Sequence, residues 1–474
     1  ENNDLTHHPE NIGVTSEALS PHESVVTERI KYYMNDYLSS ATHIIVQEGG
    51  TLVTPPRFAV HNNTKLTVEG HLSGTDSLIV GMSSVVELKN TGHTDNLGAN
   101  RYHFQDFVIE DGGMVYTWEG VGGDASVITT VNTTIGGELK GSLLSKLVVS
   151  GELNHSSTRF RVTAQGSIDG IGGGFATKKG PGSVPTSSNS GGSHAGRGGN
   201  TDKPTGETGG GPYGNYKWPT TQGSGGSTGS VAGGGGGAAV KLVAVKSFVL
   251  EGTVDMSGGD GKDAGGYNQQ ASGGGAGGSV YVETESFSGS GSLHASGGSG
   301  AVGYHGSRKA YSGGGGRIAV HCTGSRSFSG SFYARGGKKG SGFAGGGAGT
   351  IYENCGDHAD MLTLDNGDAG VPAYNTPIGM DGISNITIGH LQLFNNAKAS
   401  FQSAGLGNVM VLSARLGTRM ASTSSLREGD GGGAPAPVRI FLLLKITYSK
   451  IFNYPFFNFF NSKMITIKYF LSLC

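Results

Sequence analysis

Apolar and polar residues alternate in short runs along most of this chain, and a glycine closes many of these runs. Residues 66–72, 147–153 and 248–254 share one pattern, in which two short runs meet at a glycine. Alternation indicates strands with one face in a core. Glycine suits the bend between two strands because it adopts positive φ without steric cost. Looser versions occupy residues 44–50, 107–113 and 386–391. Spacings of about 14 to 24 residues between many of these bends predict coils of a β-solenoid.

One phrase of this pattern returns at a constant interval. It spans residues 252–259, 291–298 and 330–337, and an equivalent phrase spans 166–173. Its apolar third residue, Val254 in the first of the three copies, returns every 39 residues. A fixed period of about 20 to 50 residues marks an array of stacked structural units. The period therefore favours a repeat architecture over a compact enzyme fold.

Each repeat contains a glycine run, a short strand, an aromatic residue, a second short strand and a double glycine. The aromatic residues are Phe248, Phe287 and Phe328. Strands this short do not form stable isolated hairpins, so they are expected to pair with the neighbouring copies. One unit is either two coils or one coil that carries a long glycine loop. We favour one coil, because each unit has only two clear strands.

The N-terminal region carries one helical pattern. Residues 20–23 read Ser-Pro-His-Glu, which is a capping box with proline at the first helical position. Val26, Ile30 and Tyr33 then follow with helical spacing, as do Met34, Tyr37 and Leu38. A solenoid needs its open end covered, because unpaired strand edges promote association. We therefore expect residues 21–38 to form a capping helix rather than a partner-binding helix.

Glycine accounts for 88 of the 474 residues, well above the usual share of about 7%. Most of the excess lies between residues 170 and 349. Residues 170–232 also abound in Ser, Thr, Pro and Asn, and such composition predicts a flexible insertion. Trp218, Tyr213 and Tyr216 within it either anchor the insertion against the solenoid wall or stack on a sugar. We favour the anchoring role.

These patterns together predict an all-β fold, a parallel β-helix or solenoid with long glycine-rich loops and an N-terminal capping helix. The expected segments are 1–40 with the helix at 21–38, irregular coils at 41–169, the insertion at 170–232, the 39-residue repeats at 233–356, further coils at 357–430 and an atypical tail at 431–474. The tail contains no glycine after residue 437 and no apolar run of about 18 residues. We interpret it as non-solenoid sequence or a gene-model artefact. The absence of an initial methionine or signal peptide indicates a fragment or a processed product.

Two of the three cysteines hold equivalent positions in consecutive repeats. Cys322 lies four residues after Ile318, and Cys355 lies four residues after Ile351. Stacking brings such positions onto strands about 4.8 Å apart, within reach of a disulfide. A Cys322–Cys355 disulfide and two free buried thiols both remain open.

Four asparagines start N-glycosylation sequons, namely Asn62, Asn132, Asn154 and Asn385. Together with the possible disulfide, they favour an extracellular or cell-surface location. The formal net charge of −2 offers no footprint for nucleic acid, and no segment predicts a membrane span. Partners are then expected among glycans and extracellular proteins.

The chain offers no motif that identifies a catalytic, cofactor or metal site. There is no phosphate-binding Gly-x-x-x-x-Gly-Lys-Ser/Thr loop, and one calcium-type nonapeptide match at Gly258–Asp263 has no tandem copy. The Asp-x-x-Asp pairs at 260/263, 357/360 and 365/368 lie in turn-like sequence, where Asp is common. His294 and His321 in consecutive repeats are weak evidence for a metal. We therefore predict no catalytic residue and no cofactor.

The strand–glycine–strand pattern resembles the right-handed parallel β-helix, or pectin-lyase-like, superfamily across residues 40–430. Runs such as Gly313 to Val320 are similar to glycine-rich repeats of secreted or surface β-solenoid proteins. The resemblance implies a fold but no activity, because that fold serves lyases, hydrolases, adhesins and scaffolds. We expect a non-enzymatic structural or adhesive extracellular module, one part of a larger protein. The alternative is a carbohydrate-active β-helix enzyme, a polysaccharide lyase or glycoside hydrolase.

Overall fold

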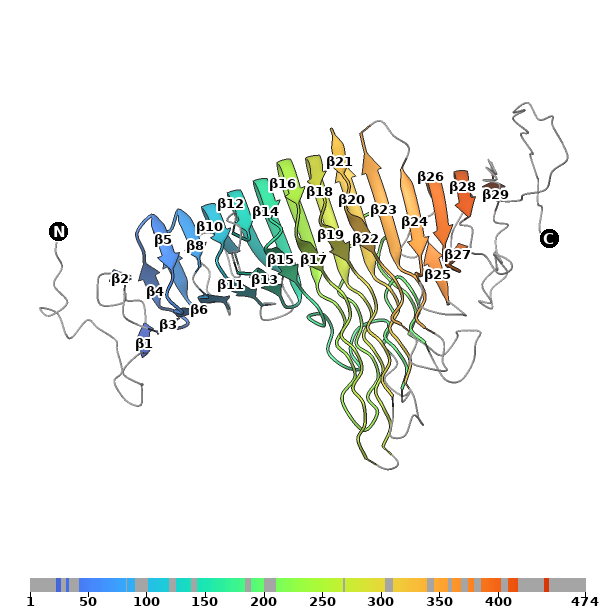
Figure 1. The fold of residues 1–474 in the computed structure, drawn as a ribbon, viewed down its shortest axis with the longest axis horizontal. Helices are drawn as coiled ribbons and strands as arrows, with labels where there is room; N and C mark the ends of the chain where they lie inside the picture. The colour runs from blue at the N-terminus through green and yellow to red at the C-terminus, as the bar shows by residue number, and fades with distance from the viewer. Residues whose placement is uncertain are drawn as a thin grey trace, which may run out of the picture.

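The computed structural model describes residues 23–26, 31–33, 42–81, 83–89, 101–118, 125–137, 143–183, 189–199, 210–266, 269–302, 310–338, 345–356, 360–367, 374–378, 385–401, 408–416 and 439–442. Within these residues all helical or strand structure is β-strand, in an elongated stack (Figure 1). Every strand pair is parallel except β23 with β24. The predicted all-β class with parallel strands is confirmed.

Two long sheets contain most of the strands. The ten-stranded sheet has the order β1 (Glu23–Val26), β3 (His43–Val46), β6 (Lys65–Val68), β9 (Val85–Leu88), β11 (Met114–Thr117), β13 (Ser145–Val149), β15 (Gly166–Asp169), β17 (Thr253–Asp255), β19 (Ser292–His294) and β22 (Ser331–Tyr333). The fourteen-stranded sheet has the order β29 (Arg439–Leu442), β28 (Asn408–Leu416), β26 (Asn385–Phe394), β24 (Met361–Asp365), β23 (Thr350–Cys355), β20 (Arg317–Cys322), β18 (Ser279–Gly289), β16 (Ala239–Leu250), β14 (Glu152–Val162), β12 (Ser126–Ile135), β10 (Arg101–Ile109), β8 (Ser77–Val80) and β5 (Arg57–Val60), and β21 (Arg326–Phe328) pairs with β18.

Two small sheets complete the fold. The three-stranded sheet contains β2 (Lys31–Tyr33), β4 (Thr51–Val53) and β7 (His71–Ser73), and the two-stranded sheet contains β25 (Asn375–Ile378) and β27 (Lys398–Phe401). The chain passes repeatedly from one long sheet to the other, and each return adds a strand beside the previous one. This order explains why short strands suffice, because each strand is paired on both sides by its neighbours in the stack.

The 39-residue unit is one coil. Val254 on β17 lies opposite Leu293 on β19, and Leu293 lies opposite Phe332 on β22. The glycine-rich part of each unit leaves the stack after the strand of the ten-stranded sheet and returns to begin the strand of the fourteen-stranded sheet. This register agrees with the preferred interpretation of the repeat, in which one unit is one coil with a glycine excursion.

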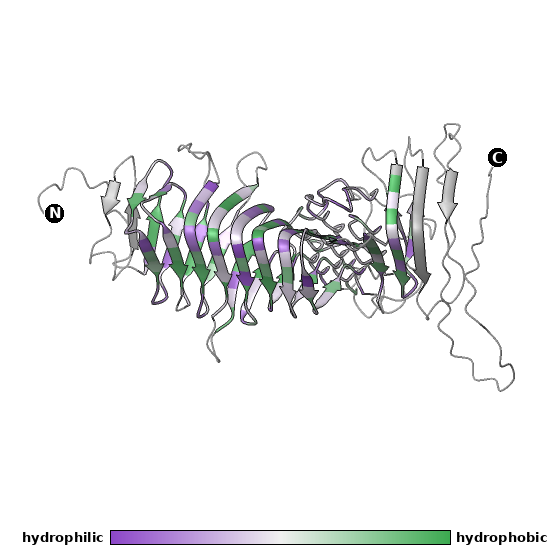
Figure 2. Ribbon diagram, turned by 90° about the horizontal axis from the view of Figure 1, so that it is seen from above, coloured by the Kyte–Doolittle hydropathy of each residue, from purple (hydrophilic) through white to green (hydrophobic). Residues whose placement is uncertain are grey.

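The main core lies between the long sheets and is filled by the apolar positions of the alternating runs. Hydrophobic and hydrophilic residues alternate along the strands in Figure 2. The predicted aromatic positions form a stack in which ring centroids are 5.7 Å apart for Phe248 and Phe287 and 4.3 Å apart for Phe287 and Phe328. Phe160 extends the stack by one coil, with its centroid 5.2 Å from that of Phe248. Burial of such rings is a large part of the hydrophobic stabilisation of a core.

The predicted capping helix over residues 21–38 is wrong. Residues 23–26 and 31–33 form β1 and β2, which pair with β3 and β4. The helical spacing is carried largely by β-branched and aromatic residues such as Val26 and Tyr33, which favour strands when a sheet edge is available. The edge strands β3 and β4 offer that partner, so this segment adds a further coil to the stack. Most of the predicted tail at 431–474 lies outside the described residues.

The glycine excursions form an ordered assembly, which we call the glycine array. It consists of the described parts of residues 171–199, 210–238, 256–278, 295–316 and 334–349. Figure 1 shows these segments as long extended chains that project from the stack beside one another. They lack helix and strand pairing, yet their backbones are joined by many hydrogen bonds.

The hydrogen bonds of the glycine array repeat every three residues. In residues 273–278, the N–H groups of Gly273 and Ala276 donate to Ser227 and Ser224. The N–H groups of residues 274 and 277 donate to the carbonyls of Tyr311 and Gly314. Those of residues 275 and 278 donate to the carbonyls of Gly259 and Met256. Each chain thus bonds to three neighbours in turn. Three residues per turn is the geometry of the polyproline II helix, whose backbone groups all point outward to partners.

Close packing in this array explains why its positions are glycine. A Cβ atom at Gly275 would lie 1.9 Å from the carbonyl oxygen of Gly235, and one at Gly313 would lie 1.9 Å from that of Gly275. At such positions even the Cβ atom of alanine would overlap the backbone of the neighbouring chain. Much of residues 189–199 and 223–229 is buried here, although the composition of residues 170–232 predicted a flexible insertion. The low content of apolar residues predicts disorder, but hydrogen bonds between backbone groups hold these segments together in place of a hydrophobic core.

Candidate functional site

A loop from Tyr213 to Gln222 lies against the face of the fourteen-stranded sheet that is opposite the main core. Arg317 on β20 holds one end of the loop, because its Nε and Nη2 donate to the carbonyl of Tyr213 at 3.1 and 2.6 Å. Its Nη1 donates to Thr350 Oγ1 at 3.3 Å. Arg317 is 1% exposed, so these bonds replace the water that a guanidinium needs.

His194 and Ser279 hold the other end of the loop. Ser279 Oγ donates to the carbonyl of Thr221 at 2.6 Å, and Thr221 Oγ1 lies 2.9 Å from His194 Nε2. His194 Nδ1 donates to the carbonyl of Gly277 at 2.8 Å. Burial, followed by the nearby Arg317 charge, lowers the pKa of His194 to about 3. The imidazole is therefore neutral, and its two nitrogens join the loop to the glycine array.

The tip of the loop is shaped by Gly214 and Asn215. Gly214 has φ +79, a backbone conformation that other residues rarely adopt. A Cβ atom there would also lie 2.8 Å from Thr221 Oγ1, so both the backbone angle and the available space favour glycine at this position. Asn215 Oδ1 accepts hydrogen bonds from the N–H groups of Lys217 and Trp218 at 2.8 and 3.4 Å. This turn presents the Trp218 side chain at the outermost point of the loop.

Trp218 is 56% exposed, and its ring lies nearly parallel to that of His321, with an interplanar angle of 8° and centroids 6.2 Å apart. His321 Nε2 donates to the carbonyl of Lys217 at 2.7 Å, which fixes the imidazole beneath the indole. We call the exposed ring face of Trp218, backed by His321, the Trp218 platform. Tyr216 is buried against Tyr352 in the expected anchoring role, whereas Trp218 contacts the sheet through His321 and leaves more than half of its side chain exposed.

Aromatic and charged side chains surround the platform. Tyr281 packs beside His321 with centroids 5.3 Å apart, and its hydroxyl donates to Glu283 Oε2 at 2.8 Å. Lys241 Nζ lies 5.6 Å from the centroid of the Tyr281 ring, in cation–π contact. Burial and the neighbouring Glu283 raise the pKa of the Tyr281 hydroxyl above its usual range, so the phenol stays protonated and acts as a donor.

An ion pair lies on the other side of His321. Lys217 Nζ is 3.4 Å from Asp360 Oδ2, and the Tyr352 hydroxyl donates to the same carboxylate oxygen at 3.0 Å. Lys217 also lies over the Tyr352 ring, 5.4 Å from its centroid. The site therefore combines one free aromatic face with two cations and two carboxylates.

A second polar cluster crosses the outer face of the ten-stranded sheet. Asp169, Asp255, His294 and Tyr333 lie opposite one another on four successive strands. The Tyr333 ring packs between His294 and Arg335, at 4.7 Å from the imidazole centroid and 4.8 Å from the guanidinium carbon. Lys146 Nζ lies 2.9 Å from Asp169 Oδ2. Burial lowers the pKa of His294, which the Asp255 charge partly opposes.

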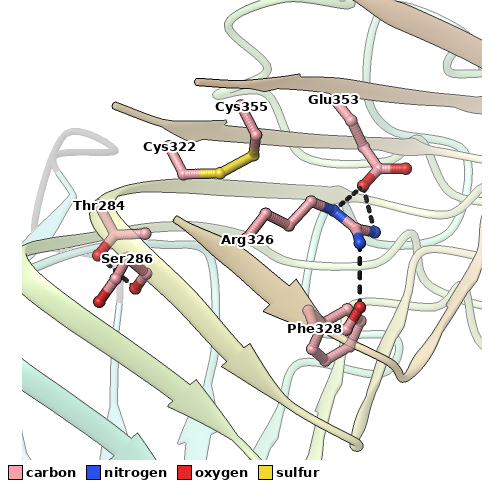
Figure 3. The surroundings of a disulfide bond; sticks show 7 residues. All are labelled: Thr284, Ser286, Cys322, Arg326, Phe328, Glu353 and Cys355. Carbon is pink, nitrogen blue, oxygen red and sulfur yellow. Dashed lines mark hydrogen bonds and ion pairs between the residues drawn. A yellow bond between two sulfur atoms is a disulfide. The ribbon is translucent and has the colours of Figure 1, made fainter. Parts of the chain in front are cut away.

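Cys322 and Cys355 form a disulfide bond between β20 and β23, with Cα atoms 4.4 Å apart (Figure 3). The structure thus selects the bridge over the free thiols. In the same region Arg326 pairs with Glu353, with Nε and Nη2 at 2.8 and 2.6 Å from Oε2 (Figure 3). Two cross-links, one covalent and one ionic, therefore join the strands at this end of the main core.

The sequon asparagines have different surroundings. Asn62 is exposed in a tight turn with φ +61, whereas Asn132 on β12 donates its amide to Asp106 Oδ1 at 2.9 Å. Asn154 is half-buried on β14 and lies opposite Lys241, and Asn385 begins β26 with its side chain outside the described part of the chain. Their glycosylation stays a prediction.

The aspartates of the predicted turns accept hydrogen bonds from backbone N–H groups. Asp260 Oδ1 accepts from the N–H of Ser299 at 2.6 Å, and Asp263 Oδ1 accepts from that of Val302 at 2.7 Å, so both tie one excursion to the next. Asp365 Oδ1 accepts from the Gly367 N–H, while Asp357 and Asp368 lie outside the described residues. Among the described residues, no three His, Cys, Asp or Glu side chains gather in a way that could hold a metal ion.

No family model, no curated protein and no solved structure matches this chain. Within the part of the chain that the structure describes, no helix is long and apolar enough to cross a membrane. The site therefore has to be interpreted from its own geometry.

Sequence reasoning overlooked both polar clusters. The row from Asp169 to Tyr333 was open to prediction, because each member follows the buried third residue of the repeated phrase. The Trp218 platform has no such signal. Trp218 and His321 are far apart in sequence, and only the path of the loop brings them together.

Proposed function

We propose that the protein is a non-enzymatic structural or adhesive module of the extracellular β-solenoid type, similar to glycine-rich parallel β-helix proteins, and that it binds a glycan or an extracellular partner. The observation that carries this proposal is the Trp218 platform. Its large aromatic ring is 56% exposed and is held in place by a turn, a stacked imidazole and a buried arginine, so a flat face is preorganised for a ligand. The Cys322–Cys355 disulfide supports an oxidising compartment.

Binding can be followed with the two tryptophans of the chain. In the variant W118F, Trp218 is the sole indole, so a ligand on the platform should change its fluorescence. W218A should bind the ligand at least tenfold more weakly, while W118A serves as the matched control because Trp118 is 40% exposed elsewhere, beneath Lys89. Equal affinity in W218A and wild type would refute the platform as the binding site.

The Asp169–Asp255 pair supports a second candidate function, a carbohydrate-active enzyme. Neighbouring parallel strands are about 4.8 Å apart, which approaches the carboxylate spacing of about 5 Å in retaining glycosidases. Lys146 pairs with Asp169, whereas Asp255 accepts the Ser257 N–H on Oδ1 and has its other oxygen as the candidate for proton transfer. Incubation with a polysaccharide panel, with calcium present, tests this candidate. New reducing ends or unsaturated products that disappear in D255N would replace the non-enzymatic proposal.

A further inference from the structure

The charges around the Trp218 platform balance one another. Lys241 and Glu283 flank Tyr281, while Lys217 and Asp360 form an ion pair on the opposite side of His321. A site that selects a charged ligand usually presents an excess of the opposite charge. The solvent-facing charges of this site sum to zero and include one free donor group and one free acceptor group, whereas the further charge of Arg317 is 1% exposed and bonded to the loop backbone.

We infer that the platform binds an uncharged pyranose residue of a glycan, in preference to an acidic or a basic sugar. This inference rests on the proposed binding function. The flat carbon–hydrogen face of a pyranose ring stacks on an exposed indole, and its hydroxyls then reach the polar groups around the indole. Aromatic contact combined with a few placed polar groups is the usual composition of a selective small-molecule site.

Glu283 is placed to accept a sugar hydroxyl. It lies opposite His321 on the neighbouring strand, so it stands beside the ring stack that supports Trp218. The Tyr281 hydroxyl occupies Oε2, and the exposed carboxylate keeps Oε1 for another donor. An ionised carboxylate accepts a hydroxyl proton in a short, strong hydrogen bond.

Lys241 is placed to donate to the same ligand. It lies opposite Tyr281 on β16, half-buried, with its ammonium over the phenol ring. No ion pair engages this ammonium among the described residues, whereas Lys217 is held by Asp360. A neutral sugar gains a bond from Lys241 and another from Glu283. An acidic sugar gains the bond from Lys241, but its negative charge is repelled by the Glu283 carboxylate. A basic sugar gains the bond to Glu283, but its positive charge is repelled by the Lys241 ammonium.

The test compares soluble hexasaccharides of matched length on enzymatically deglycosylated W118F protein, so that no glycan on Asn154 competes. Neutral ligands are β-1,4-glucose, β-1,3-glucose and α-mannose oligomers, the acidic one is a galacturonate oligomer and the basic one a glucosamine oligomer. At least one neutral hexasaccharide should bind tenfold more tightly than the two charged ones. Adding W218A to this background should abolish binding of all, with the unfolding midpoint unchanged.

Two further variants separate the polar groups. E283Q should weaken the neutral ligand several-fold and improve the acidic one, and K241M should weaken the neutral ligand and improve the basic one. Matched controls are K246M and E285Q, which remove an exposed ion pair of 3.0 Å on the same two strands, β16 and β18. These controls should leave every affinity within twofold of wild type.

Each outcome separates the two proposals. Tighter binding of an acidic or basic hexasaccharide that is lost with W218A would overturn the neutral-sugar inference and leave the platform intact. Neutral binding that persists when Trp218 is replaced would overturn the inference and the platform together. Absence of binding by every hexasaccharide would overturn the inference, and an extracellular protein partner whose binding is lost in W218A would still support the proposed function.

Discussion

The Nδ1–H of His194 donates a hydrogen bond to the carbonyl of Gly277 at 2.8 Å, so the imidazole acts inside the glycine array as a donor of the kind that backbone N–H groups supply elsewhere. A second histidine, His155, is wholly buried in the main core, where its Nε2 lies 2.9 Å from Thr133 Oγ1. Burial lowers the pKa of each imidazole from 6.5 to about 3.

These two histidines should make stability depend on acidity. Below pH 6.5 these histidines bind protons in the unfolded chain but stay neutral in the folded chain. Their contribution to the free energy of unfolding therefore falls as pH drops towards 3, and it is constant above about pH 7. Each histidine contributes about 1 kcal/mol per pH unit in that window. Urea unfolding at half-unit pH steps measures the slope, which should be shallower in H155L and in H194Q. A slope unchanged in both variants would contradict the assignment.

Substitution of one glycine should test the packing of the glycine array. In G275A the new methyl group would meet the Gly235 carbonyl oxygen at 1.9 Å, and we expect a loss of about 2 kcal/mol or more in the free energy of unfolding. The matched control is G265A in the same excursion, because nothing lies within 4 Å of a Cβ there. Thermal unfolding of both variants provides the measurement. Similar midpoints for the two would argue against a closely packed array.

Loss of the Arg317 side chain should release the loop that carries Trp218. R317A leaves the Tyr213 carbonyl without its two guanidinium donors, so trypsin should cut after Lys217 much faster than in the wild type. R317K keeps the charge but lacks the planar fork, and we expect an intermediate rate. As a control, R161A, on a different strand of the sheet, breaks an exposed ion pair with Glu251 and should leave the cleavage rate at Lys217 unchanged.

The disulfide predicts a thiol count and a stability change. Denatured protein with its three cysteines should show one free thiol before reduction and three afterwards. The double variant C322A/C355A opens a loop with a sequence separation of 33 residues, and we expect a loss of about 3 to 4 kcal/mol from chain entropy. Three free thiols before reduction, or a urea midpoint equal to that of the wild type, would exclude the bridge.

Periodicity made much of the fold predictable. Val254 and Leu293 are paired on neighbouring strands because the repeat interval equals the length of one coil. Cys322 lies opposite Cys355 because β20 and β23 also stack as neighbours, although only 33 residues separate the two cysteines. The helix over residues 21–38 failed because local spacing ignores an available sheet edge. Side-chain periodicity also says nothing about glycine, so the array built from residues such as Gly275 left no apolar signal.

The candidate site was only partly predictable. The aromatic character of residues 213–218 indicated contact with the solenoid wall, and Tyr216 makes it. Which ring remains outside depends on the bonds that Arg317 and His321 form with the loop backbone. Such bonds join residues 104 positions apart and follow no local rule.

The equality between repeat length and coil length has an evolutionary consequence. Duplication of a 39-residue stretch in frame, from Val254 to Ser292 for example, would add a strand to each long sheet and an outgoing and a returning chain to the glycine array together. Every new residue would meet copies of its existing neighbours. Unequal recombination between repeats could therefore change the length of the molecule in whole steps, and selection would act on the number of copies before it acts on their side chains.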